Sequence, residues 1–352
     1  MPEETTIWYT RCPVPSATGM AIQRGLIDDE FAPDGIVVRS LASSPDAAVR
    51  SAHYMQAATD LFRQGGNTPP LIAASKGVDH RFLGLSWTYT SQPVLVLPES
   101  DVRTAADLRG KRLSVPRRPN DKVDFWYGTT LRTYKEVLAS AGLTLDDVEL
   151  VEVDVQRTAL EDAKPNPGQR GALWGAWANA GHQRDEALAL ARGEVDAIAS
   201  EAAIGASVTA TLRLRAIANA GGFERPYNNL VPVVMSVSGP LLDRRPDLVE
   251  RFLVRVLETA EWAAEHESEA KRMIAGESGI AEEFVDAAWG ADVHTQLDLR
   301  LDEWGLAALR SQAEHLLAIG FLDRPVDVDA LIDPAPLAAA RIRLDERRAV
   351  SA

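Results

Sequence analysis

The stretch TTIWYTRCPVPSATGMAIQRG, residues 5–25, contains the first unit of an α/β fold. Residues 5–11 alternate in polarity and carry aromatic and β-branched side chains, so they predict a strand. Two prolines end that strand, and Ser16 then caps a short helix that ends before Gly25. The only cysteine of the chain, Cys12, therefore follows the carboxyl end of the first predicted strand.

The alternation of strand and helix continues outward from this unit, without an internal repeat. Further strands are expected over 35–41, 60–62, 81–87, 93–97, 112–115, 148–153, 195–199, 216–218 and 231–238, and helices over 45–52, 67–77, 123–141 and 184–192. From Pro246 onward the apolar spacing is helical. This pattern predicts an α/β fold with a helical C-terminal extension.

We expect two lobes, because a fresh strand–helix pattern begins near residue 104. The strands expected over 216–218 and 231–238 are predicted to return to the first lobe. The first lobe is thus predicted to comprise residues 1–97 plus 226–352, and the second residues 98–225.

Composition limits the possible functions. The chain has 352 residues, of which 46% are hydrophobic and 25% charged, as is ordinary for a soluble globular protein. Its net charge of -14 argues against a nucleic-acid or anionic-membrane partner. A single cysteine excludes a disulfide within the chain and any multi-cysteine metal site, and we expect neither a metal nor a cofactor.

The first residues are acidic and polar and lack the features of a signal peptide. No stretch approaches the roughly 20 apolar residues that span a bilayer. We therefore expect a cytoplasmic protein, and a monomer.

Three segments carry a resemblance to a known superfamily. They are AADLRGKR at 105–112, GEVDA at 193–197 and RPDLV at 245–249. They resemble the type 2 periplasmic-binding-protein-like superfamily, in the subgroup that contains the sulfonate, nitrate and taurine receptors. The resemblance implies two α/β lobes with a ligand cleft between them, and it indicates fold better than function.

A narrower resemblance is to the 2'-hydroxybiphenyl-2-sulfinate desulfinase family, cytoplasmic enzymes of the same fold. It rests on YTRCPVP at 9–15, His53, RQGGNTPPL at 63–71, and WGAD at 289–292 with RLD at 300–302. The catalytic cysteine, histidine and arginine of the family fall on Cys12, His53 and Arg63. The stretch between Cys12 and His53 is longer here than in the family.

The residues themselves support these roles. Ligands bind at the carboxyl ends of strands in open α/β sheets, and a thiol beside a helix N-terminus is favoured as the reactive thiolate. His53 is the candidate base or hydrogen-bond partner of Cys12. Arg63, with the backbone of Gly65 and Gly66 before a helix start, makes a candidate anion cradle for a sulfinate or sulfonate.

Other residues are candidates for substrate binding. Tyr54 is next to His53; Trp126, Trp174 and Trp177 offer aromatic stacking. Glu201 follows a predicted strand and is expected to face the cleft. Its carboxylate disfavours a purely hydrocarbon substrate, so a polar or amine-bearing sulfinate is expected, with Asn228 and Asn229 as polar contacts.

The resemblance implies a cofactor-independent desulfinase that cleaves the C–S bond of an organic, aromatic sulfinate and releases sulfite. Cys12 acts either as the nucleophile on sulfur or as the proton donor to carbon. One alternative is a substrate-binding protein for sulfonates or other organic anions that serves an ABC transporter. Another is a metal-independent decarboxylase of aromatic acids. The product distinguishes the three: sulfite, carbon dioxide or none.

Overall fold

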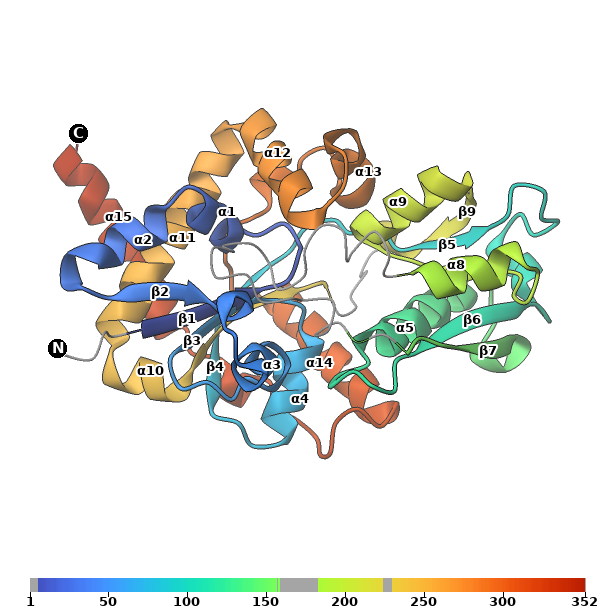
Figure 1. Ribbon diagram of the computed structural model, residues 1–352, viewed down its shortest axis with the longest axis horizontal. Helices are drawn as coiled ribbons and strands as arrows, with labels where there is room; N and C mark the ends of the chain where they lie inside the picture. The colour runs from blue at the N-terminus through green and yellow to red at the C-terminus, as the bar shows by residue number, and fades with distance from the viewer. Residues whose placement is uncertain (1–5, 157, 159–182, 224–229, 352) are drawn as a thin grey trace.

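The computed structural model describes residues 6–156, 158, 183–223 and 230–351, and it has two α/β lobes (Figure 1). The first lobe carries the N-terminal strands and most of the C-terminal helices. The second lobe carries the middle of the chain. The α/β, two-lobed fold predicted from the sequence is confirmed.

The sheet of the first lobe has the strand order β2-β1-β3-β10-β4. These strands are β1 (Thr6–Arg11), β2 (Val37–Ser40), β3 (Leu61–Gly65), β4 (His80–Ser86) and β10 (Val233–Ser238). Strands β2, β1 and β3 are parallel, whereas β10 is antiparallel to both its neighbours. In the β1–β3 pair, Thr10 lies opposite Arg63, so the ends that carry the predicted catalytic residues are adjacent.

Helices cover both faces of this sheet (Figure 1). The helices of the first lobe are α1 (Ala17–Gln23), α2 (Leu26–Phe31), α3 (Ala47–Met55), α4 (Thr68–Ser75), α10 (Gly239–Arg244), α11 (Pro246–Glu265), α12 (Glu267–Ser278), α13 (Val285–Trp289) and α15 (Ala335–Ser351). The long helix α11 places its apolar face on the sheet, where Phe252 stacks on Phe62 with ring centroids 4.0 Å apart. Ser16 caps α1 by accepting a hydrogen bond from the Gly19 amide, as predicted.

The second lobe contains two smaller sheets, β8-β5-β9 and β6-β7. Their strands are β5 (Pro93–Val96), β6 (Arg112–Arg117), β7 (Glu149–Asp154), β8 (Ile198–Ala199) and β9 (Arg215–Asn219). The helices of this lobe are α5 (Phe125–Ser140), α8 (Arg184–Ala191) and α9 (Ala202–Leu212). Tyr134 of α5 ties the two sheets together, because its hydroxyl donates to Ser114 O and accepts from the Ala199 amide.

Helix α14 (Glu303–Ala318) connects the lobes (Figure 1). Leu309 and Leu316 share one buried cluster with Leu71 of α4 in the first lobe and Trp126 of α5 in the second. Because one helix packs on both lobes, the start of α5 is held in a defined place relative to the first sheet.

Three strands differ from the prediction, two in the lobe to which they belong and one in where it ends. Strand β5 lies within the predicted bounds of the first lobe. The strand expected over 216–218 was predicted to return to the first lobe, although the predicted bounds of the second lobe include it. The two strands, β5 and β9, pair with each other in a sheet of the second lobe. Strand β3 continues to Gly65, so Arg63 lies within the strand and not at its end. Strand propensity does not reveal pairing partners, which explains these differences. None of the helices in the described ranges is both long and apolar enough to span a bilayer.

Candidate active site

Cys12 immediately follows β1, and its thiol lies against the backbone of β3 at Gly65. Its amide donates to Gln64 O at 3.1 Å, which continues the β1–β3 ladder. A Cβ atom on Gly65 would lie 2.5 Å from Cys12 Sγ, well inside van der Waals contact. Glycine at position 65 is thus what makes room for the thiol beside the sheet.

His53, in the last turn of α3, contacts the thiol. Its Nε2 lies 3.7 Å from Cys12 Sγ, and its Nδ1 lies 2.8 Å from Thr10 Oγ1. Thr10 and Cys12 are two residues apart on an extended chain, so they share a face and reach the same imidazole. Burial, assisted by the Arg63 charge, holds the pKa of His53 well below its usual value, so the ring is neutral at neutral pH.

Arg63 lies beneath the thiol, almost completely buried. Its Nε donates to His53 O at 3.1 Å, one terminal nitrogen donates to Gly66 O at 2.9 Å, and the other lies 3.6 Å from Cys12 Sγ. Burial lowers the pKa of Arg63, yet a guanidinium remains charged at neutral pH. The arginine therefore orients the histidine and places a positive charge next to the sulfur.

The neighbouring Arg11 points to the opposite face of β1, as its place in the strand predicts. Its Nε and one terminal nitrogen bind the two oxygens of Glu277 at 2.5 and 3.0 Å. This arginine thus belongs to the packing of α12 on the sheet and not to the thiol site.

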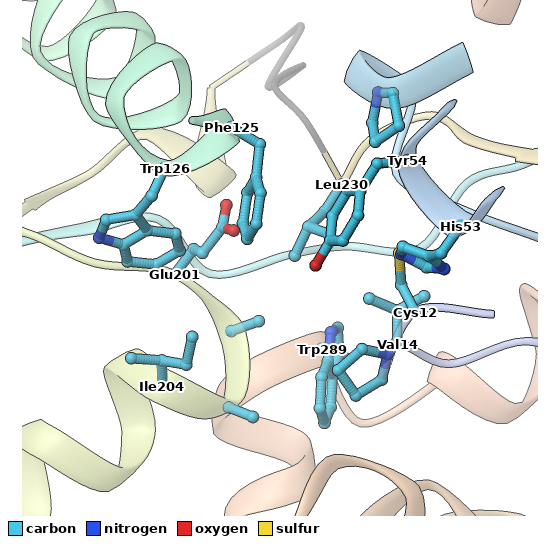
Figure 2. Close-up of a pocket in the computed structure, with 14 residues that line it drawn as sticks. Cys12, Val14, His53, Tyr54, Phe125, Trp126, Glu201, Ile204, Leu230 and Trp289 are labelled. Carbon is cyan, nitrogen blue, oxygen red and sulfur yellow. The ribbon is translucent and has the colours of Figure 1, made fainter. Parts of the chain in front are cut away.

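A cavity opens next to Cys12 and reaches the second lobe (Figure 2). Its lining is mostly apolar and aromatic. The residues are Cys12, Pro13, Val14, His53, Tyr54, Pro69, Phe125, Trp126, Glu201, Ala202, Ala203, Ile204, Leu230 and Trp289. Cys12 and His53 lie at one end of it, and Phe125, Trp126 and Glu201 lie at the other (Figure 2).

The structure brings most predicted site residues together. Tyr54, Trp126 and Glu201 line the cavity with Cys12 and His53. Arg63 and Gly65 contact Cys12, and Arg63 also donates to Gly66 O. None of the three is among the lining residues, and the anion cradle stays a prediction. Trp174, Trp177, Asn228 and Asn229 lie outside the described residues.

Sequence reasoning missed Thr10, Phe125 and Trp289 as parts of the site. Thr10 was within reach of the pattern, because a strand places residues i and i−2 on one face. Phe125 and Trp289 come from helices far from Cys12 in the sequence, and only the packing of α5 and α13 brings them to the cavity. In the described part of the chain, no cluster of three or more His, Cys, Asp or Glu side chains is arranged to bind a metal ion.

The chain is similar to known proteins in both sequence and structure. No family model matches it. It is 29% identical to the 2'-hydroxybiphenyl-2-sulfinate desulfinase of Rhodococcus erythropolis over 94% of this chain and 92% of that one, and equally so to the desulfinase of Rhodococcus qingshengii. The chain is a homologue of these desulfinases.

Solved structures agree with this relationship. This chain superposes on a cysteine-to-serine mutant of DszB, solved in complex with biphenyl-2-sulfinic acid, with a TM-score of 0.78. The two are 26% identical, and the match covers 97% of this chain and 100% of the other. The periplasmic aliphatic sulphonate binding protein SsuA of Escherichia coli has a TM-score of 0.63 at 15% identity, over 95% of this chain and 92% of that one. The latter match shows the shared periplasmic-binding-protein-like fold, as predicted.

Proposed function

We propose that this protein is a cofactor-independent desulfinase that converts an aromatic sulfinate and water into the arene and sulfite. One observation carries the proposal: the only thiol of a desulfinase homologue lies between a neutral imidazole and a buried guanidinium at one end of an aromatic cavity. The reaction breaks the C–S bond; the carbon gains a proton and the sulfur gains the hydroxyl of water. Water is therefore a reactant, and the enzyme acts as a hydrolase of C–S bonds.

Cys12 can serve this reaction in two ways. As a thiolate it attacks the sulfinate sulfur, the aryl carbon leaves with the C–S electron pair and takes a proton, and water then cleaves the S–S bond to give bisulfite and the thiol. As a thiol it protonates the carbon, sulfur dioxide leaves, and water adds to sulfur dioxide while a proton returns to the thiolate.

The geometry favours the second course. The first course starts by moving the thiol proton to His53, which creates an imidazolium in a site where burial lowers the pKa of that ring. The second course needs no charged imidazole. A thiolate forms when the proton leaves, and the Arg63 guanidinium at 3.6 Å lies where it stabilises that charge. His53 Nε2, at 3.7 Å, adds a hydrogen bond in the tautomer that carries its proton on this nitrogen.

Sulfite release tests the function directly. The purified protein is incubated with biphenyl-2-sulfinate and a panel of aryl and alkyl sulfinates, and sulfite and arene are quantified. We expect both products in equal amounts from aryl sulfinates and none in the Cys12→Ser variant. Turnover that survives in Cys12→Ser contradicts the mechanism, and tight binding of the panel without sulfite from any member contradicts the function.

The single cysteine provides a second, independent test. Iodoacetamide has one thiol to alkylate, so one adduct by mass spectrometry accounts for any loss of activity. We expect biphenyl-2-sulfinate to slow the alkylation, because the ligand occupies the cavity that Cys12 lines. The Cys12→Ser variant is the matched control for alkylation of other side chains, and mass spectrometry should detect no adduct on it.

A further inference from the structure

The carboxyl group of Glu186, on α8, hydrogen-bonds to a tryptophan in the cavity wall that faces Cys12. Trp126, which lines the cavity, donates its indole N–H to Glu186 Oε1 at 3.0 Å. Glu186 is completely buried, and it is not itself a lining residue. The bond therefore joins the tryptophan to a second helix behind the wall.

Among the described residues, the other oxygen of this carboxyl group has no hydrogen-bond partner. Glu186 Oε2 is buried and unpaired, which is costly for an ionised carboxylate and much less so for a protonated one. In agreement, burial raises the pKa of Glu186 to about 7. The charge of this group thus changes close to neutral pH.

Few charged groups face Glu186. Arg118 favours its ionised form, and Asp185 on the same helix opposes it. Tyr134 on α5 is close and stays protonated, because burial raises its pKa. Strand β8, which packs on α8, contributes only apolar side chains. The acidic side chains of β7 are exposed. The arginines at the two ends of β6 form ion pairs with Asp196 and Glu152. No ion pair with Glu186 is found among the described residues.

The same turn of α8 also holds the neighbouring part of the wall. Gln183 donates through its amide to Ala199 O at 2.5 Å and accepts from the Ser200 hydroxyl at 2.6 Å. Ser200 immediately precedes Glu201 and Ala202, both of which line the cavity. One turn of α8 thus supports two adjacent pieces of the wall, across the cavity from Cys12 (Figure 2).

We propose that Glu186 is a positioning residue: it sets the orientation of Trp126, and its ionisation weakens the binding of an anionic substrate. The substrate part of this inference rests on the proposed desulfinase function. The protonated carboxyl group keeps the N–H acceptor without adding charge. The ionised carboxylate adds a buried negative charge behind the wall, and it repels a sulfinate.

The first test follows the indole N–H of Trp126 by NMR and needs no substrate. Its signal is assigned by its absence from a Trp126→Phe variant. We expect the resonance to titrate with a midpoint near pH 7 and to stop titrating in Glu186→Gln, which keeps an acceptor oxygen but has no charge to gain. Asp185→Asn, which removes the neighbouring charge on α8, is the matched control and should leave the titration in place.

The second test measures KM and kcat for biphenyl-2-sulfinate between pH 6 and 8.5. We expect KM of the native protein to rise several-fold above neutral pH and KM of Glu186→Gln to stay level. Glu186→Leu should raise KM by about five- to tenfold at every pH, the size of one lost buried hydrogen bond, with Glu186→Gln restoring it at low pH.

The outcomes separate the two proposals. No sulfite from the native protein contradicts the function, while the NMR titration still decides the role of Glu186. An indole signal that does not titrate, or that titrates equally in Glu186→Gln, overturns the positioning role. If Glu186→Leu does not fold, the comparison of the native protein with Glu186→Gln still decides, because parallel KM profiles contradict the inference.

Discussion

The contact between Gly65 and Cys12 predicts a large effect from one methyl group. In Gly65→Ala, the new Cβ would lie 2.5 Å from Sγ, 3.1 Å from the Cys12 Cβ and 3.2 Å from the Cys12 amide nitrogen. Gly65 lies in β3, which is hydrogen-bonded to β1 on one side and β10 on the other, so its backbone has little freedom to retreat. The thiol, on a single rotatable bond, is the group that moves.

The size of the effect follows from these distances. Ordinary contacts begin near 3.4 Å, so the sulfur must shift by about 1 Å. It then leaves its place between His53 Nε2 at 3.7 Å and Arg63 at 3.6 Å. A misplacement of about 1 Å costs on the order of 100-fold in rate. The crowding should also lower the free energy of unfolding by about 1–3 kcal/mol.

The assay is kcat/KM for sulfite release together with urea unfolding. Gly276→Ala, where a methyl group meets no atom within 4 Å on an exposed part of α12, is the matched control. It should leave kcat/KM unchanged and raise the free energy of unfolding by about 0.5–1 kcal/mol, because alanine is the better helix former. In a Cys12→Ala background, Gly65→Ala should cost less stability than in the native chain, because the closest contact is gone. Activity within twofold of the native value, with unchanged stability, would refute the placement of the thiol against β3.

Three further predictions concern the supports of the site. Thr10→Val removes the hydroxyl 2.8 Å from His53 Nδ1 and should lower kcat/KM by about five- to tenfold, whereas Thr10→Ser should retain most of it; equal kinetics of the two variants would contradict the role of this bond. His53 binds its proton less readily in the folded than in the unfolded chain, so the free energy of unfolding should fall as pH drops below about 6.5. His53→Gln should reduce this pH dependence in urea unfolding. An unchanged pH dependence would count against a neutral, buried ring. Glu277→Gln leaves the buried charge of Arg11 without its partner and should cost about 3–5 kcal/mol in urea unfolding, and a loss below about 1 kcal/mol would show that α12 is not held by this pair.

Local patterns made the thiol's position predictable. Strand alternation over residues 5–11, the prolines that follow and the Ser16 cap each act within a few residues, so they place Cys12 at a strand end without further information. Alternation also turns Arg11 away from Cys12, as observed. These features were predictable because backbone stereochemistry and capping are short-range effects.

The contacts of Arg63 were not predictable in the same way. A guanidinium before two glycines is typical of an open anion site, and nothing in the adjacent sequence indicates otherwise. In the fold, β1 and α3 bring Cys12 Sγ and His53 O within reach of its nitrogens, and the side chain is buried. Which partners a buried charge finds depends on segments that are distant in the sequence.

The α/β class, the strand end that carries Cys12 and the residues that resemble a desulfinase site could all be read from the order of residues along the chain. Only the tertiary structure decided that β5 and β9 pair in the second lobe and that Trp126, held by Glu186, faces the thiol across an aromatic cavity. The physical reason is the range of the interactions. Backbone propensities act between neighbours, whereas a cavity wall depends on how apolar faces of separate helices pack, and many different sequences satisfy that packing equally well.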